Sequence, residues 1–304
     1  MSISYFVSGR FGNNLFQYFA TKVLGKILNK EYVFNASKTP LTRGKNNEKI
    51  EVENMVEVDE EKFNEIISKN IPGYRAQSRQ SRSVQSTNDP GSFTGTGYSI
   101  EGNVYVIGFF QTQEWLTLHR EYIQTLFTEE NMDRINDDYT ISSIVKHVSK
   151  IKPVRDDILI VHLRLDDFFH NAHNSEVIHP KSIIEEINKI EGINKVMFIS
   201  DTLKKPWELS YVNHLTYSVK NSIAISNSLL TDFGLLYKSR NLMVCRSTLG
   251  WIAGVLSTEN KRNWFPLNEN FKHQTINSLN ENTLTFTPEY LKSVKMFGEK
   301  DIMY

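Results

Sequence analysis

The sequence predicts an α/β protein with two compact domains, and three observations lead to this prediction. The chain has 304 residues, which is too long for one ordinary hydrophobic core. It opens with a strand, a loop and a helical pattern followed by another strand. Its second half alternates apolar runs with helical patterns, as a doubly wound parallel sheet does. Because Pro153 ends a helical pattern, we place the domain crossing there, between domains 1–153 and 154–304.

The composition excludes several classes of protein. Lys plus Arg and Asp plus Glu are 35 each, so the formal net charge is zero, and we expect no nucleic-acid partner. The single cysteine, Cys245, excludes a disulfide framework and a cysteine-cluster zinc site. No apolar run reaches the roughly 20 residues that a membrane span needs. We therefore expect no membrane span and a cytoplasmic location, bacterial or viral, unless an N-terminal anchor was removed.

The first domain begins with a βαβ pattern. Residues 3–7 are rich in β-formers and predict a strand, and residues 8–13 predict a turn. Apolar residues three to four apart over 15–27 predict a helix, and 32–34 predict a second strand. Such a unit predicts a parallel sheet covered by helices.

The middle of the chain changes character. Residues 77–103 hold few large apolar side chains and predict a long surface loop, either a plain solvated loop or a flap that faces an acceptor. Residues 104–110 predict a strand, and 112–127 and 131–150 predict helices.

The second half predicts four strands and three helices in alternation. Strands are expected at 157–163, 195–199, 215–219 and 242–245, helices at 181–190, 229–237 and 248–256, and a closing helix at 288–297. Ligands of such sheets bind beyond the carboxyl ends of the strands. The residues that follow strands, 164–167, 200–201 and 246–248, are therefore the candidates for a site.

Three short segments have residue types suited to binding an anion. The glycine loop at 8–14 matches neither a dinucleotide-binding nor a Walker A motif, and it fits a ligand-approaching backbone or a plain βα turn. Arg164 fits bidentate bonds to a diphosphate, or an ion pair with Asp166 or Asp167. Ser247 and Thr248 fit an anion at a helix start, or simple N-capping.

Four histidines follow one another closely: His162, His170, His173 and His179. Their spacing places no three on one face, and no carboxylate stands at the spacing of a metalloprotease motif. We therefore expect no metal site. Cys245 lies in an apolar strand and is expected to be buried and inert.

Several blocks of the chain, collinear over about residues 3–267, match the motifs of one family. They are SGRFGNNLFQY at 8–18, GFFQTQEWL at 108–116, HLRLDD at 162–167, FISD at 198–201, RSTLGW at 246–251 and NWFP at 263–266. In these blocks the chain resembles the α1,2-fucosyltransferases of glycosyltransferase family 11, within the wider group that includes α1,6- and protein O-fucosyltransferases.

The resemblance implies an enzyme of the GT-B type, in which two Rossmann-like doubly wound domains face a cleft. The domain 1–153 would lie on the acceptor side, and the domain 154–304 would bind the nucleotide sugar. The implied reaction is an inverting, metal-independent transfer of L-fucose from GDP-fucose to a hydroxyl of a glycan acceptor, with no cofactor.

The resemblance also implies roles for individual residues. Arg164 would contact the diphosphate and assist departure of the leaving group, and Asp167 would be the catalytic base, ahead of Asp166, His170 and Glu176. The remaining residues expected to bind the nucleotide sugar are His162, Asp201, Arg246, Ser247 and Thr248 from the second domain, with Gly9, Arg10, Gly12 and Asn13 from the first.

The chain departs from the family motifs beside the expected donor. Leu165 replaces a second arginine, Asp166 replaces a small residue, and Arg246 replaces an asparagine. Gly250 and Ile252 replace a serine and a tryptophan. These changes leave another donor sugar, such as xylose or galactose, as an alternative. A separate alternative is a glycan-binding protein on the same fold that has lost turnover.

Overall fold

The structure is a computed structural model that describes part of the chain. The described residues are 2–7, 9–34, 55–56, 96–100, 103–107, 110, 113–165, 177–178, 180–201, 203, 205–245, 247–259, 262–265 and 283–285. The chain divides into two compact units, Met1–Val145 and Lys146–Tyr304. The domain crossing expected at Pro153 stays a prediction.

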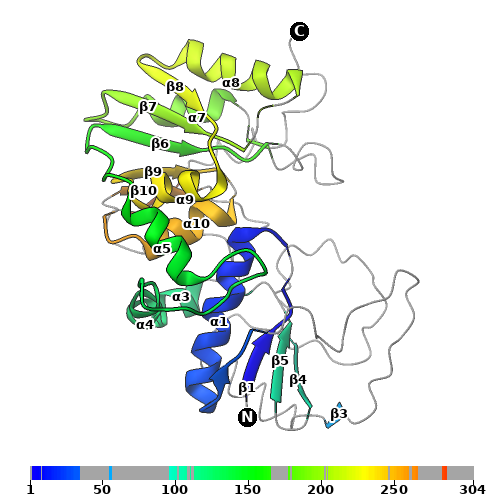
Figure 1. Ribbon diagram of the computed structural model, residues 1–304. Helices are drawn as coiled ribbons and strands as arrows, with labels where there is room; N and C mark the ends of the chain where they lie inside the picture. Colours follow the sequence, from blue (N-terminus) through cyan, green and yellow to red (C-terminus); the bar gives the residue numbers. More distant parts are fainter. Residues whose placement is uncertain are drawn as a thin grey trace. The chain divides into compact units, whose positions relative to one another are not determined.

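The second unit is built on a parallel sheet. Its described strands are β6 (Ile158–His162), β7 (Lys195–Ile199), β8 (Ser222–Ile225), β9 (Asn241–Val244), β10 (Arg262–Phe265) and β11 (Thr283–Thr285). They lie in the order β11-β10-β9-β6-β7-β8, and every neighbouring pair is parallel. Figure 1 shows β8, β7, β6, β9 and β10 in this order. Strands β7 and β8 are added on one side of β6, and β9, β10 and β11 are then added on the other side. Dinucleotide-binding sheets have this strand order.

Helices cover both faces of this sheet. On one face lie α7 (Pro180–Ile187) and α8 (Pro206–Ser218), whose apolar side chains pack with Leu159 and Val161 of β6. On the other face lie α9 (Leu229–Tyr237) and α10 (Thr248–Leu256), which pack on each other and on β6 and β9. The predicted doubly wound arrangement is confirmed in this unit.

The strand predicted at 215–219 is wrong, because these residues end helix α8 and the third strand is β8. Pro206 stands in the first turn of α8, and the Glu208 carboxylate accepts a hydrogen bond from the Lys205 N–H at 2.9 Å. Leu215 is buried on the apolar face of α8. A short apolar run in the sequence does not distinguish such a helix from a strand. Strand β11 has no counterpart among the predictions, and the predicted helix at 288–297 lies outside the described residues.

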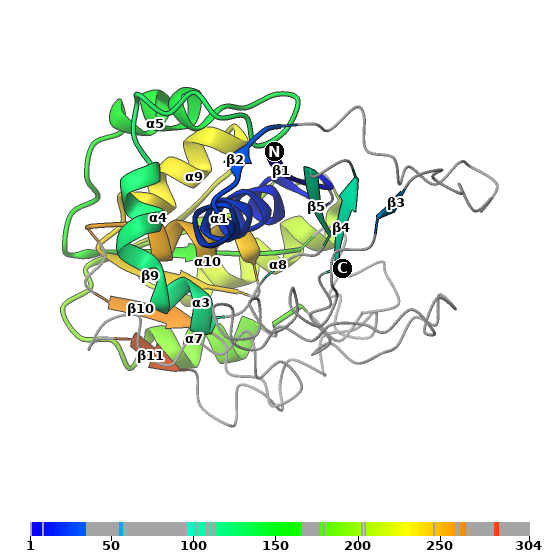
Figure 2. The same ribbon diagram turned by 90° about the horizontal axis from the view of Figure 1, so that it is seen from below.

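The first unit has a mixed sheet. Its described elements begin with β1 (Ser2–Tyr5), α1 (Phe11–Leu28), β2 (Glu31–Tyr32), β3 (Met55–Val56), β4 (Thr96–Ile100) and β5 (Asn103–Ile107). The strand order is β2-β1-β5-β4-β3. Strand β1 runs parallel to β2 and β5, whereas β4 runs antiparallel to β5 and β3. Figure 2 shows the β4–β5 pair beside β1. Strands this close in sequence pair antiparallel, because a parallel pair needs a long crossover.

The predicted surface loop at 77–103 is wrong over β4 and at Asn103, and its other residues lie outside the described part of the chain. Strand β4 pairs with β5 along its whole length, from Thr96 opposite Ile107 to Ile100 opposite Asn103. These ladder bonds join backbone groups, so a segment with few large apolar residues can still form a strand.

Two helix predictions in the first unit are partly wrong. The helix expected at 112–127 is divided into α3 (Gln113–Leu118) and α4 (Arg120–Leu126). The helix expected at 131–150 is only α5 (Ile141–Ser149). Side-chain oxygens of Asn131 and Asn136 accept hydrogen bonds from the backbone N–H groups of Asp133, Asp138 and Tyr139, which competes with helix formation. The predicted turn at 8–13 is shorter than expected, because α1 starts at Phe11.

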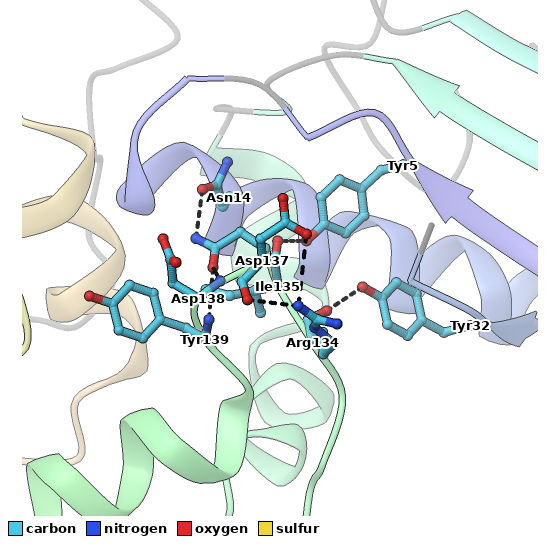
Figure 3. A network of polar contacts seen from close by, with 9 residues as sticks. Tyr5, Asn14, Tyr32, Arg134, Ile135, Asp137, Asp138 and Tyr139 are labelled. Atoms are coloured by element: carbon cyan, nitrogen blue, oxygen red, sulfur yellow. Dashed lines mark hydrogen bonds and ion pairs between the residues drawn. The ribbon is translucent and has the colours of Figure 1, made fainter. Parts of the chain in front are cut away.

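Buried tyrosines hold the loop that precedes α5, residues 127–140, against β1, β2 and α1 (Figure 3). The Tyr5 hydroxyl donates to the Ile135 carbonyl oxygen, and the Tyr32 hydroxyl donates to the Arg134 carbonyl oxygen at 2.5 Å. The Tyr18 hydroxyl donates to Asp133 Oδ2 at 2.9 Å. Burial raises the pKa of all three phenols, so they stay neutral donors.

We expect Tyr18→Phe to lower the free energy of unfolding by about 1–2 kcal/mol, since it removes a buried donor from the Asp133 carboxylate. Urea denaturation measures the change. Tyr139→Phe is the matched control, because it keeps the edge-on ring contact with Phe11 and should change stability by less than about 0.5 kcal/mol. Equal losses in the two variants would contradict the role given to the Tyr18 hydroxyl.

Candidate functional site

The candidate site lies at the carboxyl end of β6. There the strand order reverses, because β7 and β8 are added on one side of β6 and β9 lies on the other. There His162 is opposite Ile199 of β7 on one side and Val244 of β9 on the other. Backbone bonds continue beyond the strands: the Leu163 N–H donates to Ile199 O at 2.8 Å, and the Cys245 N–H donates to His162 O at 2.9 Å. The segments that follow β6, β7 and β9 are thus fixed beside one another, as sequence position predicted.

Residues near the end of β6 alternate between the two faces of the sheet. Leu163 and Leu165 are each 1% exposed and belong to the core beneath α7 and α8. His162 and Arg164 occupy the intervening positions and therefore face the side of α9 and α10. His162 is buried and Arg164 is half-buried. The strand thus places a guanidinium and an imidazole on the same face.

Helix α10 begins on that face. Its N-cap, Ser247, is buried and has extended backbone geometry, with φ −122° and ψ 123°, and its side chain makes no capping hydrogen bond. The first turn of α10 contains no acidic residue. A helix start of this kind presents backbone N–H groups and the positive end of the helix dipole to an anion. Of the two interpretations of Ser247 and Thr248, simple side-chain capping by Ser247 is not what the structure shows.

His162 is held as a neutral side chain. Burial, followed by the nearby positive charge of Arg164, lowers the pKa of its imidazole to about 3. Its Nδ1 atom is buried without a hydrogen-bond partner and lies against Gly250 in the first turn of α10. Among the described residues at this end of the sheet, the guanidinium of Arg164 thus lies near an uncharged imidazole.

Two carboxylates lie near this point, one after strand β7 and one in the first turn of helix α9. Asp201 comes after β7, and its Oδ1 accepts a hydrogen bond from Ser200 Oγ at 3.3 Å. Asp232, in the first turn of α9, is 5% exposed and accepts a bond from Asn227 Nδ2 at 2.9 Å. Burial raises the pKa of Asp232, and the negative charge of Asp201 raises it further, against the lowering effect of the Asn227 hydrogen bond.

Asp232 is a candidate that sequence reasoning did not select. An acid in the first turn of a helix is common because it complements the helix dipole, so its position alone did not indicate a site. The available signal was its position after a strand of the parallel sheet, β8.

The predicted residues of the first unit lie together at the start of α1. Gly9 has φ +75°, and a Cβ there would lie 2.2 Å from Asn13 Nδ2, so the close approach of this side chain requires glycine. Arg10 is the N-cap of α1, and Gly12 and Asn13 belong to its first turn. These residues follow the carboxyl end of β1, the position where a parallel pair of strands presents its ligands.

Phe110 lies beyond the carboxyl end of β5, the strand parallel to β1, and was not selected from the sequence. It is buried with a left-handed backbone, φ +52°, and its carbonyl oxygen accepts a bond from the Trp115 indole N–H at 2.6 Å. A bulky residue is uncommon in this conformation, and backbone strain of this kind clusters at functional sites.

Several predicted residues lie outside the described part of the chain. They are Arg246, the favoured base Asp167, and the other candidates Asp166, His170 and Glu176, with the histidines His173 and His179. Among the residues that the structure describes, no three His, Cys, Asp or Glu side chains group as metal ligands, and the absence of a metal stays a prediction. Cys245 faces the α7 and α8 side, and burial raises the pKa of its thiol.

A hollow of about 410 Å³ lies at the opposite end of the same sheet. It is lined in part by Arg155 and Arg240, which pair with Asp157 and Asp156. The carboxyl end of the sheet, where Arg164 follows β6 and α10 begins, is the end at which such sheets bind ligands, and we take it as the candidate site.

Comparison with known proteins gives a weak structural likeness. No family model and no curated protein matches the chain. A structure of POFUT1 in complex with GDP aligns at 14% identity and TM-score 0.44, covering 87% of this chain and 98% of that one. POFUT1 in complex with GDP-fucose gives 16% and 0.40, with 87% and 96% covered. A further POFUT1–GDP crystal form gives 14% and 0.38, with 93% and 97% covered.

These values do not place the chain in a family. Among the described helices, none is long and apolar enough to cross a bilayer.

We expect His162 to make the protein sensitive to acid. An unfolded histidine takes up its proton near pH 6.5 and the folded one near pH 3, so the unfolded state holds more protons between these values. Stability is therefore lost as the pH falls below about 6.5, by up to about 1.4 kcal/mol per pH unit. Between about pH 7 and about pH 5, wild type should lose about 2 kcal/mol more than His162→Gln in urea denaturation.

The matched control for this experiment is His214→Gln, since His214 is exposed on α8. It should retain the acid sensitivity of wild type. The assignment to His162 fails if His162→Gln loses as much stability as wild type over the same range.

Proposed function

We propose that the chain is a glycosyltransferase that moves L-fucose from GDP-fucose to a hydroxyl of a glycan, and that its second unit holds the donor. One observation carries the proposal. At the carboxyl end of β6, the His162 imidazole lies near the Arg164 guanidinium and beside the first turn of α10. This is the point at which the strand order of the sheet reverses, and the order is that of nucleotide-binding folds.

The charges and donors at this point suit a diphosphate. Arg164 supplies a planar fork of N–H donors, which matches the oxygens of a phosphate. The first-turn N–H groups of α10 and the hydroxyls of Ser247 and Thr248 supply further donors. Arg246, beyond the described residues, is proposed to add a second positive charge. His162 contributes a neutral hydrogen-bond donor, which adds a bond to the ligand without adding a positive charge.

The carboxylates beside this point favour guanine among the bases. Guanine presents N–H donors on its base-pairing edge, and a carboxylate is their natural acceptor. Asp201 follows β7, and it lies close enough to Asp232, in the first turn of α9, for its negative charge to raise the pKa of Asp232. We propose that this pair recognises the base, with Asp201 shaping the pocket. This proposal agrees with the GDP donor that the resemblance implies.

The reaction is a displacement at the anomeric carbon of the sugar. The acceptor oxygen forms a bond to this carbon from one side while the bond to the GDP oxygen breaks on the other, which inverts the configuration. The bonding electrons leave with GDP, and the acceptor proton passes to a base, for which we propose Asp167. Arg164 and the α10 N–H groups stabilise the charge that grows on GDP, the task that a metal ion performs in other enzymes.

The residues at the start of α1 are proposed to approach the donor or the acceptor from the first unit. Gly9 permits close backbone approach, and the first-turn N–H groups of α1 offer donors beside Arg10. Asn13 is fixed against Gly9 and adds an amide to the same place.

We expect GDP to raise the melting temperature in the presence of a chelator. Arg164→Ala should lower the rate of transfer by about 100-fold or more and weaken GDP binding, because the leaving diphosphate loses its cation. Arg164→Lys should recover only part of this loss, since an ammonium lacks the bidentate fork. Calorimetric titration with GDP and a transfer assay with labelled donor measure these effects.

Arg155→Ala is the matched control, because Arg155 is exposed at the opposite end of the sheet and pairs with Asp157. It should leave GDP affinity and transfer near wild-type values. Full transfer activity in Arg164→Ala would refute the role given to Arg164.

A screen of labelled GDP- and UDP-sugars tests the donor. Transfer from GDP-fucose alone supports the proposal as stated. Transfer from a xylose or galactose donor would keep the mechanism and replace the sugar. Glycan binding with no nucleotide binding would instead identify a non-catalytic glycan-binding protein.

A further inference from the structure

Gly250 permits a close contact between α10 and the end of the central strand. A Cβ at this position would lie 2.8 and 2.9 Å from the two methyl carbons of Val244 and 3.0 Å from His162 Nδ1. The first two distances are shorter than side chains tolerate, and the third requires the imidazole to move. The absence of a side chain at residue 250 is therefore what lets the His162 ring lie directly against the first turn of α10.

The His162 ring lacks the hydrogen bond that usually fixes a buried imidazole. Its Nδ1 atom is buried and has no partner, which is unfavourable relative to a satisfied group. Packing against Gly250 must then set the orientation of the ring. A buried polar atom left in this state is explained when the orientation of the side chain serves a ligand.

The surroundings of Nδ1 also select one form of the ring. A neutral imidazole carries a single N–H, and a proton on Nδ1 would be a donor with no acceptor. With the proton on Nε2, the Nδ1 lone pair faces the positive end of α10, which favours this tautomer. His162 is then a neutral donor through Nε2, with its direction fixed by its contact with the helix.

We propose that Gly250 is a positioning residue of the donor site, which seats the His162 imidazole against α10 and so aims its Nε2–H at the nucleotide. The inference rests on the proposed function, because it assumes that the nucleotide binds at this end of the sheet. The family motif has a serine where this chain has Gly250. The direct seat of the imidazole on the helix backbone is thus a feature of this chain.

A double-mutant cycle tests the coupling of the two residues. GDP affinity is measured by calorimetric titration for wild type, Gly250→Ala, His162→Ala and the double variant. We expect Gly250→Ala to weaken GDP binding by about tenfold when His162 is present, and by less than about threefold when residue 162 is alanine. The same factor in both backgrounds would overturn the proposal, because Gly250 would then act independently of the imidazole.

A second variant separates the orientation of His162 from the packing of α10 on β9. Val244→Ala removes the methyl groups that the new Cβ would meet, so Val244→Ala/Gly250→Ala should melt within a few degrees of Val244→Ala alone. Its GDP affinity should stay about tenfold below that of Val244→Ala, because the contact with His162 persists. Recovery of affinity together with stability would show that Gly250 serves packing alone.

A nitrogen-15 spectrum of the histidine side chains gives a test that does not depend on GDP. Wild type should show His162 as the neutral tautomer protonated at Nε2, and Gly250→Ala should move its ring resonances. Unchanged His162 resonances in Gly250→Ala would overturn the proposal. If wild type binds no GDP, the proposed function fails, while this spectrum still reports whether Gly250 seats the ring.

Discussion

The pairing of β6 with β9 is the constraint on which the candidate site depends. These parallel strands lie side by side although the chain completes β7 and β8 between them. The bond from the Cys245 N–H to the His162 carbonyl oxygen extends this pairing beyond the last strand residues. Since α10 starts after Ser247, the same pairing brings its first turn to the face that carries His162 and Arg164.

Successive side chains along β6 and just beyond it alternate between the apolar core and the polar candidate site. Leu159, Val161, Leu163 and Leu165 enter the core beneath α7 and α8. The positions between them carry the imidazole and the guanidinium toward α9 and α10. A shift of one residue in register would bury Arg164 in the apolar core, so the same pairing that stabilises the sheet also specifies the polar site.

The sequence predicted much of the second unit, because its apolar runs and helical patterns are distinct there. The start of α10 at Thr248 follows directly from a strand, a hydroxyl residue and an apolar run. Leu215 misled the prediction because a short apolar run fits a strand and a buried helix equally well. Asp232 was missed because its burial depends on neighbours far along the chain, and the Asn131 and Asn136 turns depend on side-chain bonds that periodicity does not report.

The strand order also affects how the molecule folds. Ile160 to His162 pair with residues 242–244, so a long stretch of chain must be ordered before these strands meet. Pairing of β6 with β9 therefore costs more loop-closure entropy than pairing of strands that are close in the sequence. On the ribosome, the polar end of this sheet stays incomplete until α10 has emerged, so a ligand of this end would act mainly by slowing unfolding of the finished unit.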